Sequence, residues 1–319
     1  MKYSIICLSI FVLLFCSTTE ALVHTKKAFN HTSWGEQTFY YEYLPPGYGN
    51  GTKFPALIFL HGAGESANGP CSFSTLERVT DNGGTPPNYI KNNVWPLELP
   101  FIVISPQAPW GHGPVTSEIA VRIVKEAYAT HADLNRIYVT GLSQGGGAVW
   151  QLIAASLTNA RNVAAVVPIC GSVGPTSPSN YTSIVDANVP IWAFHAVNDG
   201  AVNINQTSTA WINGLNGAGL TPAPKYTIFQ SGGHYIWGNV YETNRAINTQ
   251  NYIYDWLLSY SRSPSSSTTS TTGPASTSTT STTTGSTTTG STTTGGSGTC
   301  GGGPTQTFRF AGNCTLVCN

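Results

Sequence analysis

The sequence has 319 residues, and its 14 basic and 14 acidic residues cancel, while charged residues make up only 9% of the chain. This balance excludes a basic field that would attract nucleic acid, and no acidic tail is present. The length allows one large domain or two small ones. So few charges, together with many Gly, Ser, Thr and Asn residues, are typical of an extracellular protein that hydroxyl groups and sugars keep soluble.

The N-terminal segment predicts export. Lys2 precedes an apolar run over residues 5–15, and polar residues then lead to the small residue Ala21. This is the pattern of a secretory signal peptide, so we expect residues 1–21 to be removed near Ala21 and the protein to be secreted. The run is too short for a membrane anchor, which needs about 20 apolar residues, and no later segment is long enough.

Cysteines and glycosylation motifs fit the same compartment. Five of the seven cysteines remain once the signal peptide is removed, and an odd count leaves one free or paired with another molecule. The five N-x-S/T sequons lie at Asn30, Asn50, Asn180, Asn205 and Asn313.

Strand and helix patterns alternate over residues 22–260 and predict one α/β domain. The run at 54–60 is almost entirely apolar, which indicates a strand buried on both faces and hence a mainly parallel central sheet flanked by helices. We expect Thr116 or Ser117 to cap the helix-forming segment at 119–129. The expected packing positions of the last helix are Ile247, Tyr254, Leu257 and Leu258. The expected strands are 38–44, 54–60, 101–105, 137–139, 163–169, 189–194 and 226–229, and the expected helices are 119–129, 148–154, 207–215 and 241–260.

The composition changes completely after this domain. Residues 261–298 are almost only Ser, Thr, Gly and Pro, which predicts a disordered and O-glycosylated linker because such a segment buries too little apolar surface to fold. Residues 299–319 form a short tail that contains Cys300, Cys314 and Cys318. A disulfide-held knob that anchors or adheres and a degenerate remnant are both open interpretations of this tail.

A possible nucleophile lies between a predicted strand and a predicted helix. Residues 141–145 read G-L-S-Q-G, and this context is that of a nucleophile elbow with Ser143 at its tip. The tight turn forces Ser143 into a strained conformation, and glycine at 141 and 145 leaves room for neighbouring backbone. The following helix N-terminus favours developing negative charge. A plain glycine-rich loop is the alternative.

The partners of such a serine are predicted from chain order. Asp199 follows the strand at 189–194, and His234 follows the strand at 226–229, so acid and base come after Ser143 as in α/β-hydrolases. Asp199 is alternatively a plain turn residue, since N-D-G is turn chemistry, and Asp186 competes for the acid role but precedes its strand. Six other histidines are present, but none of them follows both Asp199 and a further strand, so structural roles suit them better. They are His24, His31, His61, His112, His131 and His195.

Two backbone amides are expected to bind the oxyanion. Gln144, the residue after the nucleophile, supplies one N–H, and Ala63 supplies the other, with Gly64 as second choice. The glycines around Ala63 let the backbone turn its amides inward. A flexible loop at the strand end is the alternative reading of this segment.

Six segments in chain order resemble one known group of enzymes. They are F-L-H-G-A-G-E, S-P-Q, L-N-R-I-Y-V-T-G-L-S-Q-G-G, V-P-I-C-G, V-P-I-W-A-F-H-A-V-N-D and G-G-H-Y-I-W. Together they resemble secreted α/β-hydrolases of the predicted-peptidase, carboxylesterase and phospholipase/thioesterase type, akin to feruloyl and acetylxylan esterases and polyhydroxyalkanoate depolymerases, over about residues 39–260. The resemblance implies the α/β-hydrolase fold, with Ser143 as nucleophile, Asp199 as acid and His234 as base.

Two residues depart from the pattern of that group. Ala196 replaces the glycine of the usual F-H-G-x-x-D motif, and Gln144 stands where methionine is common. Neither change affects the predicted chemistry, because the group that Gln144 contributes is its backbone amide. The resemblance covers neither the linker nor the tail.

The sequence therefore predicts a secreted serine hydrolase that cleaves carboxylic esters through an acyl-enzyme, without metal or cofactor. Trp110 and Trp237 either form the substrate pocket or are ordinary core residues. We also expect a Cys71–Cys170 disulfide, because both cysteines flank the catalytic edge. A serine peptidase with the same triad and a non-catalytic, stalked adhesion protein are the alternatives. Polysaccharide, polyester, lipid and small acyl substrates remain open.

Overall fold

The computed structural model describes residues 22–31 and 36–262. The predicted signal peptide at 1–21, the tail at 299–319 and almost all of the predicted linker lie outside these residues, as does the sequon at Asn313. Among the described residues, no helix is long and apolar enough to cross a membrane.

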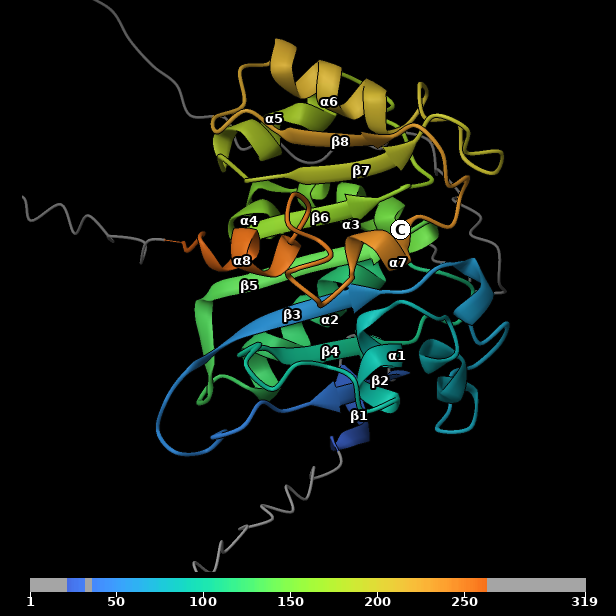
Figure 1. The fold of residues 1–319 in the computed structure, drawn as a ribbon. Coiled ribbons are helices and arrows are strands. Elements are labelled where there is room, and N and C mark those ends of the chain that lie inside the picture. The colour runs from blue at the N-terminus through green and yellow to red at the C-terminus, as the bar shows by residue number, and fades with distance from the viewer. Residues whose placement is uncertain (1–21, 32–35, 263–319) are drawn as a thin grey trace, which may run out of the picture. The chain divides into compact units, whose positions relative to one another are not determined.

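The described chain forms one eight-stranded sheet with helices on both faces, so the predicted α/β architecture is confirmed (Figure 1). The strand order is β1-β2-β4-β3-β5-β6-β7-β8. The β1–β2 and β2–β4 pairs are antiparallel, and all other neighbours are parallel. The strands are β1 (His24–His31), β2 (Glu36–Tyr43), β3 (Phe54–Leu60), β4 (Ile102–Pro106), β5 (Ala132–Leu142), β6 (Ala165–Ile169), β7 (Trp192–Ala196) and β8 (Lys225–Phe229).

Two hydrophobic clusters cover the two faces of this sheet. Every residue of β3 is buried, and alternate side chains enter different clusters: Ile58 packs in one and Leu57 in the other. The first cluster receives side chains from α2 to α6, and the second from α1, α7 and α8. The helical segments are η1 (Ala63–Glu65), η2 (Thr75–Thr80), α1 (Pro86–Lys91), α2 (Pro114–Ala127), α3 (Gln144–Ala155), α4 (Leu157–Arg161), α5 (Ser179–Asp186), α6 (Ser208–Gly217), α7 (Trp237–Val240) and α8 (Ile253–Leu258).

The helix predicted over 241–260 is wrong in extent, because within this range only α8, Ile253–Leu258, is helical. Turns lie between α7 and α8, and Ile247 is 71% exposed rather than packed. Side chains in this stretch bond to nearby backbone: Glu242 accepts from the Asn244 N–H at 2.8 Å, and Asn244 accepts from the Ala246 N–H at 2.9 Å. Such local bonds compete with helical ones, which explains why a periodic apolar pattern did not suffice here.

The cap predicted at Thr116 or Ser117 is also wrong. Helix α2 starts earlier, at Pro114, with Gly113 as its N-cap. Proline suits the first helical position because its φ is preset and it has no N–H to leave unpaired. Thr116 instead accepts from the Gly113 N–H at 2.8 Å, and the Ser117 hydroxyl donates to the Gly113 carbonyl at 2.8 Å.

The C-terminal end of the described chain is anchored by Arg262. Its guanidinium donates to the carbonyl oxygens of Val163 at 2.6 Å, Ala187 at 2.5 Å and Ala160 at 2.9 Å. Hydrogen bonds from a charged donor are stronger than neutral ones, so this arginine holds the chain against the end of the sheet opposite the strand termini that carry the site. Sequence patterns assigned no role to Arg262, since its partners are distant carbonyls.

Candidate active site

Ser143 occupies a sharp turn between β5 and α3. Its backbone has φ 53° and ψ −116°, a conformation that non-glycine residues adopt only when their surroundings enforce it. The Ser143 N–H donates to the Ile169 carbonyl at 2.9 Å, and the Ser143 carbonyl accepts from Gly147 at 2.9 Å and Ser172 at 3.0 Å. These three bonds fix the strained turn from β6 and from the first turn of α3.

Glycine is required on both sides of this turn because backbone passes very close. A Cβ atom at Gly145 would lie 2.0 Å from the Leu60 carbonyl oxygen, and one at Gly141 would lie 2.7 Å from the Gly145 carbonyl carbon. Neither neighbour is a flexible side chain that could move aside. The G-x-S-x-G pattern is thus explained by the packing of β5 and α3 against the end of β3.

The candidate acid and base stand on neighbouring loops at the same sheet edge. Asp199 lies three residues after the end of β7, and His234 lies five residues after the end of β8, which pairs with β7 in parallel. The two loops are joined directly, since the Gly233 N–H donates to the Asn198 side-chain oxygen at 3.0 Å. Parallel strands bring both loops to the edge at which Ser143 stands.

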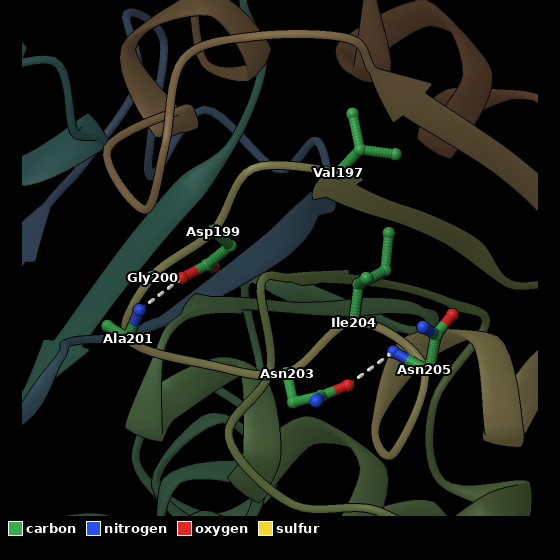
Figure 2. Close-up of a pocket in the computed structure, with 7 residues that line it drawn as sticks. All are labelled: Val197, Asp199, Gly200, Ala201, Asn203, Ile204 and Asn205. Carbon is green, nitrogen blue, oxygen red and sulfur yellow. Dashed lines mark hydrogen bonds between the residues drawn. The ribbon is translucent and has the colours of Figure 1, made fainter.

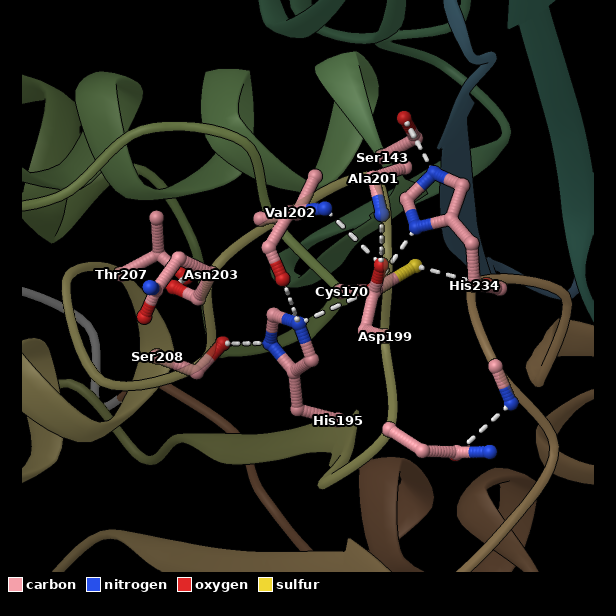
Figure 3. A network of polar contacts seen from close by, with 12 residues as sticks. Ser143, Cys170, His195, Asp199, Ala201, Val202, Asn203, Thr207, Ser208 and His234 are labelled. Carbon is pink, nitrogen blue, oxygen red and sulfur yellow. Dashed lines mark hydrogen bonds and ion pairs between the residues drawn. The ribbon is translucent and has the colours of Figure 1, made fainter.

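Hydrogen bonds connect Ser143, His234 and Asp199 in that order (Figure 3). The distance from His234 Nε2 to Ser143 Oγ is 2.9 Å, and that from His234 Nδ1 to Asp199 Oδ2 is 2.8 Å. The His234 side chain is 15% exposed, whereas that of Asp199 is fully buried. The structure therefore brings together the three residues predicted from sequence, in the geometry of a nucleophile, its base and an orienting acid.

The Asp199 carboxylate is saturated with donors. Its Oδ1 accepts from the N–H groups of Ala201 and Val202, each at 2.8 Å. Its Oδ2 faces His234 and also His195 Nε2, at 3.0 Å. Burial by itself raises the pKa of Asp199, but the hydrogen bonds from His234, Val202 and Ala201 outweigh it and lower the pKa overall. Asp199 is thus both a turn aspartate, through Oδ1, and the partner of His234, through Oδ2.

The predicted oxyanion donors lie next to Ser143. Gln144 is the first residue of α3, and Ala63 is the first residue of η1, followed by Gly64. Among the described residues, the amides of Ala63, Gly64 and Gln144 donate to no backbone carbonyl. A Cβ atom built on Gly62 would lie 3.7 Å from the Ser143 Cβ, so the start of η1 directly adjoins the serine. Their role as oxyanion donors stays a prediction.

Trp237 and Trp110, the predicted substrate-binding residues, have different surroundings. Trp237 is only 5% exposed; it packs edge-on against His234, with ring centroids 5.8 Å apart, and donates to Asn82 at 3.1 Å. Asn82 in turn donates to Glu65 at 3.1 Å. Trp110 is 73% exposed. Trp237 therefore supports His234 and the η1 loop, and only Trp110 presents an open face.

Two cavities contain candidate site residues in their linings. One, of about 340 Å³, is lined by loop residues after β7, including Asp199, Gly200 and Asn203 (Figure 2). The other, of about 850 Å³, is lined in part by Trp110 and His112. Neither lining includes Ser143 or His234, and only the smaller cavity reaches a residue of the hydrogen-bonded trio, Asp199.

The predicted Cys71–Cys170 disulfide is wrong: both cysteines are free in the described part of the chain. Cys71 Sγ points to the Gln107 carbonyl and Cys170 Sγ to the His234 carbonyl, each at 3.5 Å. The prediction assumed only that both cysteines lie at the same sheet edge. A disulfide also needs Cβ atoms that face each other at close range. No pattern in the sequence indicates that Cys170 is a neighbour of His234.

Cys170, Asp199 and His234 also form a compact group of potential metal ligands, with donor atoms within 4.8 Å of one another. A metal ligand must be deprotonated, yet burial raises the pKa of the Cys170 thiol to about 12. Asp199 and His234 are already hydrogen-bonded to each other. We therefore assign these groups to hydrogen bonding.

Two further buried histidines, His61 and His112, lie against each other and take no part in the Ser143–His234–Asp199 hydrogen bonds. His61 Nε2 accepts from the Ala108 N–H at 3.0 Å, and burial lowers the pKa of His61 to about 4. Its ring lies 4.3 Å from that of His112, whose pKa burial holds well below the usual value. His61 thus braces the loop after β4, as expected for a histidine at a strand end.

Comparison with known proteins gives structural matches without sequence-family matches. No protein-family model matches the sequence, and no curated protein is significantly similar to it. A solved thermostable esterase is 27% identical, with a TM-score of 0.54; the match covers 75% of this chain but only 63% of that protein.

More distant structures share the fold. A feruloyl esterase module from Clostridium thermocellum, solved with sinapinate, is 18% identical with a TM-score of 0.51, and the match covers 75% of this chain and 88% of that one. Dipeptidyl peptidase 4 from Porphyromonas gingivalis is 12% identical with a TM-score of 0.51, covering 76% of this chain and 36% of that one. One architecture thus serves both esterases and a peptidase, so residues of the site must decide the chemistry.

Proposed function

We propose that this chain, which has the α/β-hydrolase fold of these solved esterases, is a secreted serine hydrolase that cleaves carboxylic esters through an acyl-enzyme. The observation that carries the proposal is the unbroken hydrogen-bond path from Ser143 Oγ through His234 to Asp199, at 2.9 and 2.8 Å. The 27% identity to a thermostable esterase favours ester over amide substrates.

The reaction proceeds in two halves on the same groups. Ser143 Oγ attacks the ester carbonyl carbon while His234 Nε2 takes the hydroxyl proton, and Asp199 stabilises the charged imidazole. The amides of Gln144 and Ala63 bind the oxyanion of the tetrahedral intermediate. His234 then gives its proton to the leaving alcohol, which leaves an acyl group on Ser143. Water then attacks the acyl carbon while His234 takes a proton from it, and His234 returns the proton to Ser143 Oγ as the bond to the acyl group breaks and the carboxylic acid is released.

Replacement of the nucleophile tests the proposal. Ser143→Ala should reduce hydrolysis of p-nitrophenyl acetate to the uncatalysed background, a loss on the order of 10⁴-fold or more, while Tm is kept. Ser105→Ala is a matched control, because Ser105 is a buried serine of the same sheet whose hydroxyl has no partner among the described residues. Retained turnover in the Ser143→Ala protein would refute the assignment.

A covalent probe separates the alternatives. A fluorophosphonate should label the native protein at Ser143, and failure to label would favour a non-catalytic adhesion protein. A panel of feruloyl, acetyl-xylan and chain-length-graded esters, run beside peptides, then identifies the substrate class. Trp110, with its open face beside the 850 Å³ cavity, is the residue whose replacement by alanine should alter preference for bulky acyl or sugar groups.

Secretion is proposed on the pattern at residues 1–21 and on the sequons. Asn30, Asn50 and Asn205 lie on the exposed surface, where a glycosyltransferase can reach them. Expression of the full chain in a eukaryotic secretory host should place the protein in the medium with a new N-terminus near residue 22. Deglycosylation should then lower its mass. Retention inside the cell would contradict this part of the proposal.

A further inference from the structure

A second imidazole contacts the carboxylate oxygen that His234 uses. His195 Nε2 lies 3.0 Å from Asp199 Oδ2, and His234 Nδ1 lies 2.8 Å from the same atom. His195 is the fourth residue of β7, so the sheet itself positions its ring, and the side chain is fully buried. Figure 3 shows Asp199 between the two rings. Asp199 thus joins one histidine from a loop and one from a strand.

The surroundings of His195 determine which nitrogen carries its hydrogen. Nε2 faces only acceptors, namely the Asp199 carboxylate and the Val202 carbonyl oxygen at 3.2 Å, so Nε2 must be the donor. Burial lowers the pKa of His195, and the ring is therefore neutral with Nδ1 as an acceptor. The hydroxyl of Ser208, whose Oγ lies 2.8 Å from Nδ1, must then donate to it.

Ser208 is placed for this role by the start of α6. It is the first residue of that helix and is completely buried, and among the described residues its hydroxyl has no hydrogen-bond partner other than His195. A buried hydroxyl without a partner costs about 1–3 kcal/mol, so the bond to His195 is also the one that satisfies Ser208. The tautomer of His195 is thereby fixed from both ends.

We propose that Ser208 and His195 form a positioning relay that orients Asp199 for its partnership with His234. The arrangement resembles the reacting side: Ser143 and Asp199 contact the two nitrogens of His234, while Ser208 contacts Nδ1 of His195, whose Nε2 lies 3.0 Å from the same Asp199 oxygen. Neither Ser208 nor His195 touches the reacting atoms. This inference rests on the proposed function, since positioning matters only if His234 acts as the base.

The relay has two physical effects on Asp199. The His195 Nε2, held 3.0 Å from Oδ2, opposes rotation of the carboxylate away from His234. It also withdraws part of the negative charge from that oxygen, so the carboxylate attracts a positive charge on His234 less strongly. The titratable groups that face this centre are His195, Asp199 and His234, with the Cys170 thiol beside Asp199.

Two substitutions of His195 distinguish positioning from packing. His195→Phe keeps a ring but removes the donor, and should lower kcat by about 10- to 100-fold with KM nearly unchanged. The acidic limb of its kcat/KM–pH profile should move to higher pH, because Asp199 then attracts positive charge on His234 more strongly. His195→Gln places an amide N–H near the Nε2 position and should retain activity within about threefold of wild type.

Two results would overturn the relay. One is a folded His195→Phe protein with wild-type kcat and an unmoved pH profile. The other is equal impairment of the Gln and Phe proteins without a shift of the acidic limb, which indicates a packing role only.

Ser208→Ala tests the relay even if His195→Phe does not fold. Loss of the hydroxyl leaves the imidazole in place but removes one of the two contacts that fix its tautomer and orientation, and kcat should fall by about 3- to 10-fold. Ser117→Ala is the matched control: Ser117 is also buried in the first turn of a helix, but its hydroxyl donates to the Gly113 carbonyl at 2.8 Å. Equal kcat losses in the two variants would contradict the relay.

A spectroscopic measurement decides the inference without turnover. In ¹⁵N-histidine-labelled protein, long-range ¹H–¹⁵N correlation at neutral pH should show His195 neutral with hydrogen on Nε2 and His234 with hydrogen on Nδ1. The His195 signal is assigned by its loss in His195→Gln. Hydrogen on Nδ1 of His195 overturns the relay even in an active enzyme. The predicted pair of tautomers in a protein that hydrolyses no ester contradicts the proposed function and leaves the placement of His195 on Asp199 intact.

Discussion

Ser143 and the Asp199–His234 pair meet at one sheet edge, but different forces hold the two sides there. The serine side is held through the backbone, by hydrogen bonds of the Ser143 main chain and by close packing: Ser143 has φ 53°, and a Cβ atom at Gly145 would lie 2.0 Å from a carbonyl oxygen. The acid–base side stands on loops and is held by side-chain hydrogen bonds, such as Asn198 to Gly233 at 3.0 Å. The serine side therefore tolerates no added atom, whereas the acid–base side tolerates no lost donor or acceptor.

The largest expected effect follows from adding one methyl group to each side. Gly145→Ala must displace backbone at the end of β3, which should cost about 4 kcal/mol or more and lower Tm by about 10 °C or abolish soluble expression. Gly200→Ala, on the acid loop, meets no atom within 4 Å and should leave Tm nearly unchanged. Thermal denaturation of both proteins measures the contrast. A Gly145→Ala protein with wild-type Tm would remove the basis for calling the serine side sterically fixed.

The next effect comes from exchanging an acceptor for a donor on the acid–base side. In Asp199→Asn the remaining oxygen can still accept from Ala201 and Val202, so the loop should fold. An amide in place of Oδ2 faces the N–H groups of His234 and His195, which cannot both be satisfied. We expect kcat/KM for p-nitrophenyl acetate to fall on the order of 10³- to 10⁴-fold, with a much smaller change in Tm. If the Asp199→Asn protein instead fails to fold, the contacts of Oδ2 are needed for folding as well as for catalysis.

The same contrast explains what could be predicted from sequence. Ser143, Asp199 and His234 each follow a parallel strand closely, and parallel strands gather such positions at one edge, so order and spacing suffice to select them. The strained turn was also predictable, because its glycines are adjacent in sequence. What holds the acid–base side was not predictable: the contacts of His195 and Asn198 depend on which way side chains point from their loops and strands.

Side-chain hydrogen bonds to nearby backbone explain where the apolar periodicity predicted a helix incorrectly. The stretch after α7 has apolar residues at helical spacing, yet Glu242 and Asn244 bond to nearby backbone and produce turns. Strand β1 escaped prediction because its sequence, HTKKAFNH, is polar, as befits a strand at the sheet edge. Pairing with β2 rather than burial defines that strand, and pairing is not visible in the pattern of a single segment.

His112 allows the effect of burial on stability to be measured. Both of its ring nitrogens are buried without partners among the described residues, and burial holds the pKa of His112 well below 6.5. A histidine kept neutral in the folded state stabilises the fold fully above its unfolded pKa, and this contribution is lost as pH falls below about 6.5. His112→Phe should therefore weaken the acid dependence of the unfolding free energy, measured by urea denaturation between neutral pH and about pH 5. His131→Phe, at a less buried position, controls for the loss of a histidine; equal pH dependence in the two variants would argue against burial as the cause.

The smallest effect concerns Glu65, which links the two sides. Its carboxylate accepts from Asn82, whose side chain accepts from Trp237, and Trp237 packs on His234, so one chain of contacts runs from the η1 loop to the base. Burial raises the pKa of Glu65, although hydrogen bonds from the backbone and Asn82 oppose the shift.

The sign of the pH effect for Glu65 follows from this raised pKa. A raised carboxyl pKa means that folding favours the protonated form, so the stability that Glu65 contributes is present below its unfolded pKa and is lost as pH rises through the folded one. Glu65→Gln keeps an acceptor for Asn82 but never charges, and should therefore raise Tm at pH 7 to 8 by about 2 °C, with the gain vanishing near pH 4. Because the η1 backbone is untouched, kcat should stay within about threefold of wild type. A Tm gain that persists undiminished at pH 4 would mean that packing, rather than the buried charge, sets the cost of Glu65 at this junction.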